Sequence, residues 1–264
     1  MYAFDIARPN TLAEAKAALA AEEAQALGGG QTLIPALKQR LAAPSVLVSL
    51  TAIPEMVGVC LSDAGEVCIG AATTHAQVAR DAAAHYPALA DLAAHIGDPA
   101  VRNRGTIGGS LANNDPSACY PAAALGSGAT IKTDAREISA DDYFRGMFET
   151  ALNDGEIITE VRFPVPERAN YQKFEQPASR FALVGVFVAK YADGVRVAVT
   201  GASESGVFRW SEAEAALASD FSVGALEGLS MPADGMIGDL HGTPDYRAHL
   251  VGVLTKRAVA AAGS

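Results

Sequence analysis

The sequence lacks the features that mark several large classes of protein. Half of its 264 residues are apolar, but no apolar run reaches the roughly 18 residues that a transmembrane helix needs. The N-terminal stretch MYAFDIARPN has no basic segment followed by an apolar core, so we expect no signal peptide. These absences predict a cytoplasmic protein without a transmembrane segment.

Cysteine and positive charge are both scarce. The three cysteines, Cys60, Cys68 and Cys119, show no C-x-x-C spacing, which argues against a disulfide framework. They are also too few for an iron–sulfur cluster held by this chain alone. Cys60 and Cys68 flank a predicted hairpin turn, LSDAGEV, and we interpret them as packing thiols. The net charge of −10 disfavours contact with phosphate backbones, so we expect no nucleic-acid partner.

Several catalytic motifs are missing as well. The sequence contains no Rossmann or P-loop glycine motif, no H-E-x-x-H and no G-x-S-x-G. His75, His85 and His95 recur every ten residues, a spacing that turns successive side chains to different faces of a helix. We therefore predict structural or exposed histidines and no metal site. The acidic pairs at 22–23 and 141–142 are predicted to be solvated, which leaves no candidate catalytic residue.

The patterns that are present predict an α+β chain. Thr11 and Glu14 form a capping-box pattern that opens an alanine-rich helix. Beyond the proline pair at 164–166, two β-rich runs meet at Asp193-Gly194, a strong hairpin signal. Further helices are predicted over 32–41, 75–96 with a break at Pro87, 211–220 and 244–262, and strands over 24–27, 45–50, 56–61, 66–73, 129–133 and 155–165.

Two glycine-rich segments stand out, ALGGGQTLIP at 26–35 and RGTIGGSL at 104–111. The second lies in a loop-like stretch, 102–121, that is unusually rich in Gly, Asn, Asp and Pro. Glycine allows backbone N–H groups to converge on an anion, and Thr or Ser adds hydroxyl donors. Two such segments are suited to hold a pyrophosphate from both sides, although a tight turn explains either one alone.

Three segments in order, GGGQTLIP, IGDPAVRNRGTIGGSLANNDP and YQKFEQPASRFALVGV, closely resemble the FAD-binding medium subunits of the molybdenum hydroxylases. That family includes carbon monoxide dehydrogenase medium chains and the corresponding domain of xanthine dehydrogenase, and the resemblance covers nearly the whole chain. It implies an α+β fold with a vanillyl-alcohol-oxidase (PCMH)-type FAD-binding domain at 1–165, in subdomains of about 1–53 and 54–165. A smaller α+β C-terminal domain with antiparallel strands would occupy 166–264.

The resemblance also implies an electron-transfer function. FAD on this chain would take electrons from [2Fe-2S] clusters of a small partner subunit and pass them to an external acceptor, while a large subunit holds molybdopterin. The expected assembly is a dimer of heterotrimers. Two alternatives stay open, a self-contained flavin oxidoreductase of the same fold and a binding module that has lost its cofactor. The substrate, whether carbon monoxide, an aldehyde, a purine or an N-heterocycle, is chosen by the large subunit.

Position by position, the resemblance assigns cofactor contacts to two pyrophosphate segments, two apolar flavin contacts, a lysine near the flavin and two further polar positions. These residues are Gly28, Gly29, Gly30, Gln31, Thr32 and Leu33; Thr106, Ile107, Gly108, Gly109 and Ser110; Ile96 and Ile158; Lys173; and Asn113 and Cys119. Cys119 stands where relatives commonly carry Asp, and Asn113 where many carry His. Because a thiol is a weak hydrogen-bonding group, Asp115 or Asn113 is the candidate to compensate.

Overall fold

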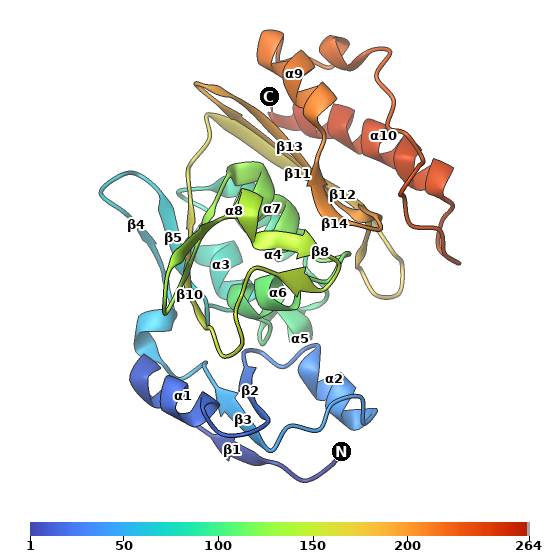
Figure 1. Cartoon of the computed structure of the whole chain (residues 1–264). Coiled ribbons are helices and arrows are strands. Elements are labelled where there is room, and N and C mark those ends of the chain that lie inside the picture. Colours follow the sequence, from blue (N-terminus) through green and yellow to red (C-terminus); the bar gives the residue numbers. More distant parts are fainter. Residues whose placement is uncertain (263–264) are drawn as a thin grey trace.

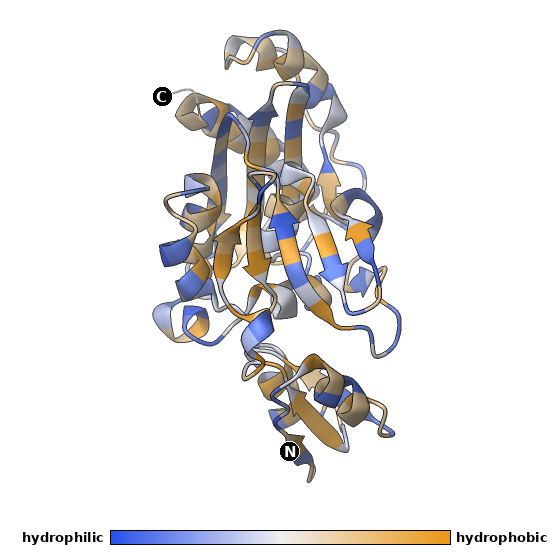
Figure 2. Ribbon diagram, turned by 90° about the vertical axis from the view of Figure 1, so that its left-hand side faces the viewer, coloured by the Kyte–Doolittle hydropathy of each residue, from blue (hydrophilic) through white to orange (hydrophobic). Residues whose placement is uncertain are grey.

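The computed structural model describes residues 1–262 as three successive regions, each built around its own β-sheet (Figure 1). The N-terminal region lies at the bottom of Figure 1, the middle region above it, and the C-terminal region at the upper right. In Figure 2 orange and blue bands alternate along several strands of the sheets, as in strands with one apolar and one polar face. The α+β class predicted from the sequence is confirmed.

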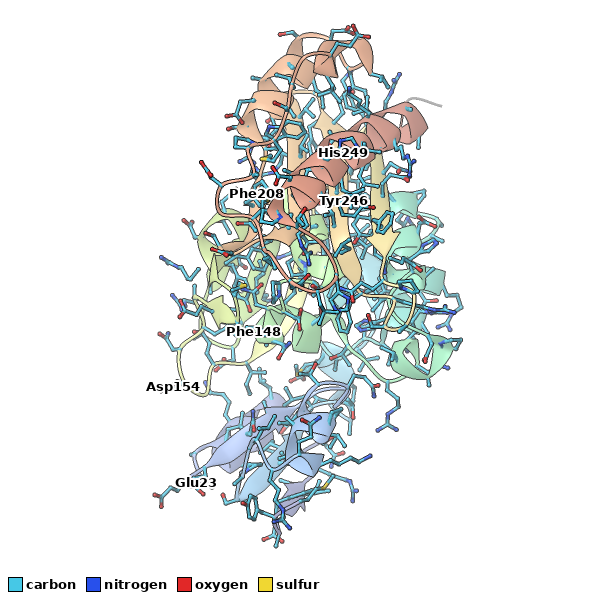
Figure 3. The ribbon with its side chains drawn as sticks, turned by 90° about the vertical axis from the view of Figure 1, so that its right-hand side faces the viewer. Glu23, Phe148, Asp154, Phe208, Tyr246 and His249 are labelled. Carbon is cyan, nitrogen blue, oxygen red and sulfur yellow. The ribbon has the colours of Figure 1, made fainter. Side chains whose placement is uncertain are left out.

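The N-terminal region is a small parallel sheet with two helices. Its strands, β1 (Asp5–Ala7), β2 (Ala24–Leu27) and β3 (Val46–Ser49), pair in the order β1-β3-β2, and its helices are α1 (Leu12–Leu19) and α2 (Leu33–Lys38). Thr11 caps α1 as predicted, by accepting a hydrogen bond from the N–H of Glu14 at 3.2 Å. The Glu14 carboxylate accepts from the N–H of Asn10. Glu23 is exposed on this region, as expected (Figure 3).

The middle region holds a five-stranded antiparallel sheet in the order β4-β5-β10-β6-β7. The strands are β4 (Val59–Leu61), β5 (Val67–Gly70), β6 (Thr130–Thr133), β7 (Glu137–Ser139) and β10 (Ile158–Phe163), with a separate pair, β8 (Phe144–Gly146) and β9 (Glu149–Thr150). The helices are α3 (His75–Asp81), α4 (Pro87–Ala94), α5 (Pro99–Arg102), α6 (Ile107–Asn113), α7 (Cys119–Ser127) and α8 (Ala140–Tyr143), after a 3-10 turn at Pro54–Met56. As predicted, Pro87 separates two helices.

The loop expected over 102–121 is largely helical, which corrects the sequence reading. Helix α6 begins after Thr106, whose hydroxyl accepts from the N–H of Gly109 and so caps the first turn. Helix α7 is apolar on every side, and all nine of its residues are buried. Such a helix is stable only inside a protein, and α7 packs between the middle region and strands β12 and β13.

The C-terminal region is a four-stranded antiparallel sheet covered by helices. Its strands are β11 (Arg168–Glu175), β12 (Ala182–Tyr191), β13 (Gly194–Ser203) and β14 (Gly206–Arg209), and it also contains α9 (Ser211–Ser219), a 3-10 turn at Gly224–Leu226 and α10 (Pro244–Ala262). The predicted hairpin is present, with Tyr191 paired to Gly194. Helix α10, which carries Tyr246 and His249, crosses the sheet on the face opposite α7 (Figure 3).

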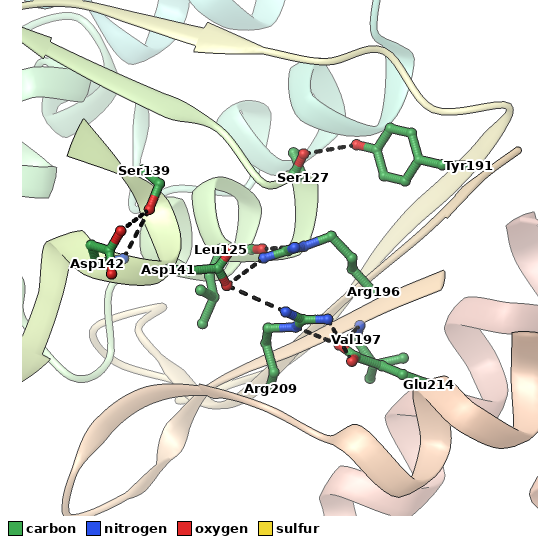
Figure 4. Close-up of polar contacts among 10 residues, drawn as sticks. All are labelled: Leu125, Ser127, Ser139, Asp141, Asp142, Tyr191, Arg196, Val197, Arg209 and Glu214. Atoms are coloured by element: carbon green, nitrogen blue, oxygen red, sulfur yellow. Dashed lines mark hydrogen bonds and ion pairs between the residues drawn. The ribbon is translucent and has the colours of Figure 1, made fainter. Parts of the chain in front are cut away.

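A charged network joins the middle and C-terminal regions (Figure 4). Asp141 on α8 accepts from Arg196 on β13 at 2.6 Å and from Arg209 on β14 at 3.3 Å. Arg209 also pairs with Glu214 on α9, whose carboxylate accepts from the N–H of Val197. Asp141 is therefore not simply a solvated acid, as the sequence suggested, because it links helix α8 of the middle region to the C-terminal sheet.

Candidate functional site

One cavity of about 630 Å³ lies where the three regions meet. Fifteen of the sixteen residues predicted to contact a cofactor line it. The exception is Ile107, whose side chain is fully buried in the core. The cavity wall also contains polar residues that the sequence reading did not select. These are His75, Gln25, Ser117, Glu156, Ser179 and Arg180, and Asp115, the candidate to compensate for Cys119, also lines the wall.

The first glycine segment presents unused hydrogen-bond donors to the cavity. Within residues 1–262, the backbone N–H groups of residues 29–32 donate to no other group. Gly30 has a φ of +73°, a conformation that favours glycine. A row of free N–H groups at the end of a strand and the start of a helix is an anion-binding arrangement.

The second glycine segment is built differently from the expectation. The N–H groups of Ile107 and Gly108 donate to the carbonyls of Thr73 and Ala71, and that of Gly109 to the Thr106 hydroxyl. Apart from the Thr106 N–H, which donates to no described residue, the backbone donors of this segment are therefore already used inside the protein. The first turn of α6 contains two glycines, so it leaves room in the cavity, and Ser110 adds a hydroxyl to the wall.

The glycines allow the two segments to touch. A Cβ atom on Gly29 would stand 1.9 Å from the carbonyl oxygen of Arg104, and one on Gly28 would stand 2.7 Å from the Thr106 hydroxyl. Side chains at these positions would push the segments apart. The sequence reading attributed the glycines to contact with a ligand, whereas the structure shows Gly28 against the Thr106 side chain and Gly29 against the backbone at Arg104.

His75 is the polar residue that the sequence reading missed. It begins helix α3, is 5% exposed, and lies against the ring of Tyr120 at 5.3 Å. Burial, together with the positive charge of Arg102, lowers the pKa of His75 from 6.5 to about 4, so its ring is neutral at physiological pH. Within the described residues its Nδ1 atom has no hydrogen-bond partner. Such a buried orphan is costly unless a ligand supplies the partner.

Lys173 on β11 forms hydrogen bonds with two other segments of the chain at another part of the cavity wall. Its Nζ donates to the carbonyls of His95 and Arg180 at 2.7 Å each, and lies 3.7 Å from Cys119 Sγ. The Lys173 side chain is only 4% exposed and also pairs with Glu175 at 3.5 Å. Burial raises the pKa of the Cys119 thiol, although Lys173 opposes that shift. Lys173 is therefore a tethered cation with a neutral thiol beside it.

A second charged pair lies at the edge of the cavity. Arg136 donates to the Glu156 carboxylate at 3.0 Å. Hydrogen bonding from Arg136 outweighs burial and lowers the pKa of Glu156 from 4.5 to about 2. Nearby, Lys16 on α1 reaches Asp134 at 2.7 Å and so bridges the N-terminal and middle regions.

Residues 1–262 contain neither a metal-binding cluster nor a membrane-spanning helix. No group of three or more His, Cys, Asp or Glu side chains is arranged to hold a metal ion. No described helix is long and apolar enough to cross a membrane.

Comparison with known proteins identifies the family. A profile of the family described as "FAD binding domain in molybdopterin dehydrogenase" matches residues 2–166, more than half of the chain. The chain belongs to this family. FAD is therefore its cofactor, and it is a flavoprotein subunit of an oxidoreductase of the molybdenum hydroxylase class.

Members of the family are similar to this chain over nearly their whole length. The carbon monoxide dehydrogenase medium chain of Afipia carboxidovorans is 34% identical, with 97% of this chain and 95% of the relative covered. The nicotine 6-hydroxylase medium subunit of Paenarthrobacter nicotinovorans is 34% identical, with 92% and 91% covered. The crystal structure of quinoline 2-oxidoreductase from Pseudomonas putida 86 matches with a TM-score of 0.88 and 31% identity, covering 99% of this chain and 97% of that chain.

The cavity has the properties that FAD requires. The free N–H groups of residues 29–32 suit a diphosphate, and the neutral ring of His75 forms part of the wall. Ile96 and Ile158 add apolar wall for a flat ring. A self-contained flavin oxidoreductase is not favoured, because the relatives that match over full length are medium chains or subunits.

Proposed function

We propose that FAD bound in this cavity relays electrons from a [2Fe-2S] cluster of a partner subunit to an external acceptor. The observation that carries the proposal is the row of free backbone N–H groups at 29–32, which faces the small first turn of α6 across the cavity. When bound, the flavin supplies the conversion between one-electron and two-electron transfer. The chain's own residues bind and orient the cofactor and need perform no acid–base step.

Each part of the cavity has a separate role in this proposal. Residues 29–32 receive the diphosphate, helped by the hydroxyls of Thr32 and Ser110. Ile96 and Ile158 pack against the flavin ring. Lys173 places a positive charge beside it while holding the ends of α4 and of the β11–β12 loop together. His75, as a neutral ring, forms a hydrogen bond with the cofactor through Nε2, because its Nδ1 is enclosed by the protein.

We also propose the assembly in which this subunit works. Several relatives are named as medium chains, and a medium chain implies larger and smaller partners. In the proposed dimer of heterotrimers the large subunit carries molybdopterin and chooses the substrate, and the small one carries the [2Fe-2S] clusters. The cytoplasmic location and the domain boundaries near residues 53 and 165 stay predictions from the sequence.

The test of this function begins with the absorption spectrum of the gently purified chain and identification of any flavin released by acid. A yellow protein that yields FAD and not FMN, and that candidate substrates do not bleach without partner subunits, is the expected result. A colourless chain that cannot be reconstituted, alone or co-expressed with its partners, would support a cofactor-free binding module instead.

A further inference from the structure

Cys60 and Cys68 face each other across the β4–β5 hairpin, which the sequence reading did not foresee. The register of the hairpin pairs the two residues directly. Flanking pairs are hydrogen-bonded, from the N–H of Ser62 to Glu66 at 2.9 Å and from the N–H of Gly70 to Gly58 at 3.0 Å. Because hydrogen-bonded pairs recur at every second position of an antiparallel ladder, Cys60 and Cys68 form such a pair.

The arrangement is compatible with a covalent bond between the two sulfurs. Opposed residues in a hydrogen-bonded pair have Cα atoms about 5.5 Å apart, within the roughly 4.4–6.8 Å that disulfides span. The two side chains lie on the same face of the hairpin, because directly opposed residues of an antiparallel pair point to the same side. Strand β4 is a three-residue edge strand that pairs only with β5, so it can move toward β5 without disturbing another strand.

The two thiols differ in their access to solvent. Cys60 is exposed, whereas Cys68 is 6% exposed. Burial, reinforced by the nearby Glu160 carboxylate, raises the pKa of Cys68 from 9.0 to about 11, so it stays a thiol at neutral pH. Cys60 is therefore the residue that meets a reagent first, and Cys68 is the residue beside it that completes the reaction. Neither lines the FAD cavity.

We propose that Cys60 and Cys68 form a reversible redox-modification site that a low-molecular-weight disulfide oxidises. The Cys60 thiolate attacks one sulfur of the reagent, which forms a mixed disulfide and releases one thiol after proton uptake. Cys68 then loses its proton and attacks the Cys60 sulfur, which closes the protein disulfide and releases a second thiol. The protein gives up two electrons and two protons, and the reagent takes them as two thiols.

The test exposes the purified full-length chain to graded mixtures of reduced and oxidised glutathione, followed by acid quenching and alkylation of the remaining thiols. Intact mass and peptide mapping then assign each cysteine. We expect the parent chain to lose two hydrogens, with Cys60 linked to Cys68, and dithiothreitol to reverse the change. The Cys68→Ser variant should stop at a glutathione adduct on Cys60, and the matched Cys60→Ser variant should form neither product.

The parent chain alone can overturn the proposal, so the result does not depend on how well the variants fold. A parent chain that collects only a glutathione adduct, or that stays fully reduced in excess oxidised glutathione, would show that the pair does not close. A disulfide mapped to Cys119 would do the same.

Discussion

At the scale of single residues, the close contact between the two glycine segments can be tested at Gly29. We expect Gly29→Ala to lower the free energy of unfolding by about 1–3 kcal/mol, because its Cβ overpacks against the Arg104 carbonyl, and to reduce the FAD content of the purified protein. The matched control is Gly252→Ala in α10, where a Cβ meets no atom within 4 Å. Alanine there should stabilise the helix by roughly 0.5–1 kcal/mol. Chemical denaturation and the flavin-to-protein absorbance ratio measure both effects, and a Gly29→Ala protein that matches the parent in both would contradict the contact.

His75 offers a second test at this scale, because its Nδ1 is buried without a partner, whereas its Nε2 binds FAD in the proposed site. Replacing it by Phe removes an unsatisfied buried group, so the FAD-free chain should lose no stability. The same change removes one hydrogen bond to FAD and should weaken binding by up to about tenfold, in line with 0.5–1.5 kcal/mol per bond. His75→Gln, which keeps a polar atom near the Nε2 position, should retain most of the affinity. Fluorescence titration with FAD measures this, and equal affinity in all three proteins would exclude His75 from the site.

The resemblance to the family predicts Asp at the position of Cys119, and the surroundings of Cys119 suit an Asp. An Asp at this position would place a carboxylate beside the Lys173 ammonium and at the N-terminus of α7, both of which favour a negative charge. We therefore expect Cys119→Asp to slow the loss of FAD during gel filtration. Cys119→Ser, similar in size and uncharged, is the control. Retention that is the same in the Asp, Ser and parent proteins would mean that this side chain does not act on the cofactor.

At the scale of elements, the Arg136–Glu156 pair ties the β6–β7 turn to the segment leading into β10, and its effect depends on pH. The folded-state pKa of Glu156, about 2, lies below its ordinary value of 4.5. The pair therefore stabilises the fold above pH 4.5, and this stabilisation is lost as pH falls toward 2. Glu156→Gln should lower stability at pH 7 and flatten the pH dependence of the unfolding free energy over that window. Denaturation curves at several pH values test this, and a parent-like slope in the variant would contradict it.

The elements also show which parts of the fold the sequence could predict. Helices α1 and α10 and the β12–β13 hairpin follow from local signals, namely a cap, an amphipathic repeat and an Asp-Gly turn. Helices α6 and α7 escaped prediction because their Gly, Asn and Pro content is typical of loops, and only tertiary burial makes α7 stable. The site residues came from a resemblance in three segments. His75 was missed because nothing local indicates that the contacts of α3 will bury its ring at the cavity.

At the scale of the whole molecule, the cavity joins the regions, so its ligand should stabilise them together. A ligand that binds only the folded chain adds about 2.7 kcal/mol of stability at a hundred times its Kd. FAD contacts the diphosphate segment at 29–32 and the apolar wall at Ile96 and Ile158 in the proposed site. FMN carries the flavin with a single phosphate and no adenosine, so it cannot engage both ends of the cavity. We expect FAD to raise the midpoint of thermal unfolding in a concentration-dependent way, and FMN at the same concentration to raise it much less.

ADP completes this comparison, because it supplies the diphosphate and adenosine without the flavin ring. If residues 29–32 are the diphosphate site, ADP should stabilise the chain weakly and compete with FAD, and Gly29→Ala should remove the ADP effect. If FMN instead equals FAD while ADP has no effect, the flavin with its single phosphate accounts for binding, and the adenosine end of the cofactor has no site of its own. FMN and ADP each contain one part of FAD. Differential scanning fluorimetry with the three ligands on the same preparation therefore shows which part of the cofactor each end of the cavity binds.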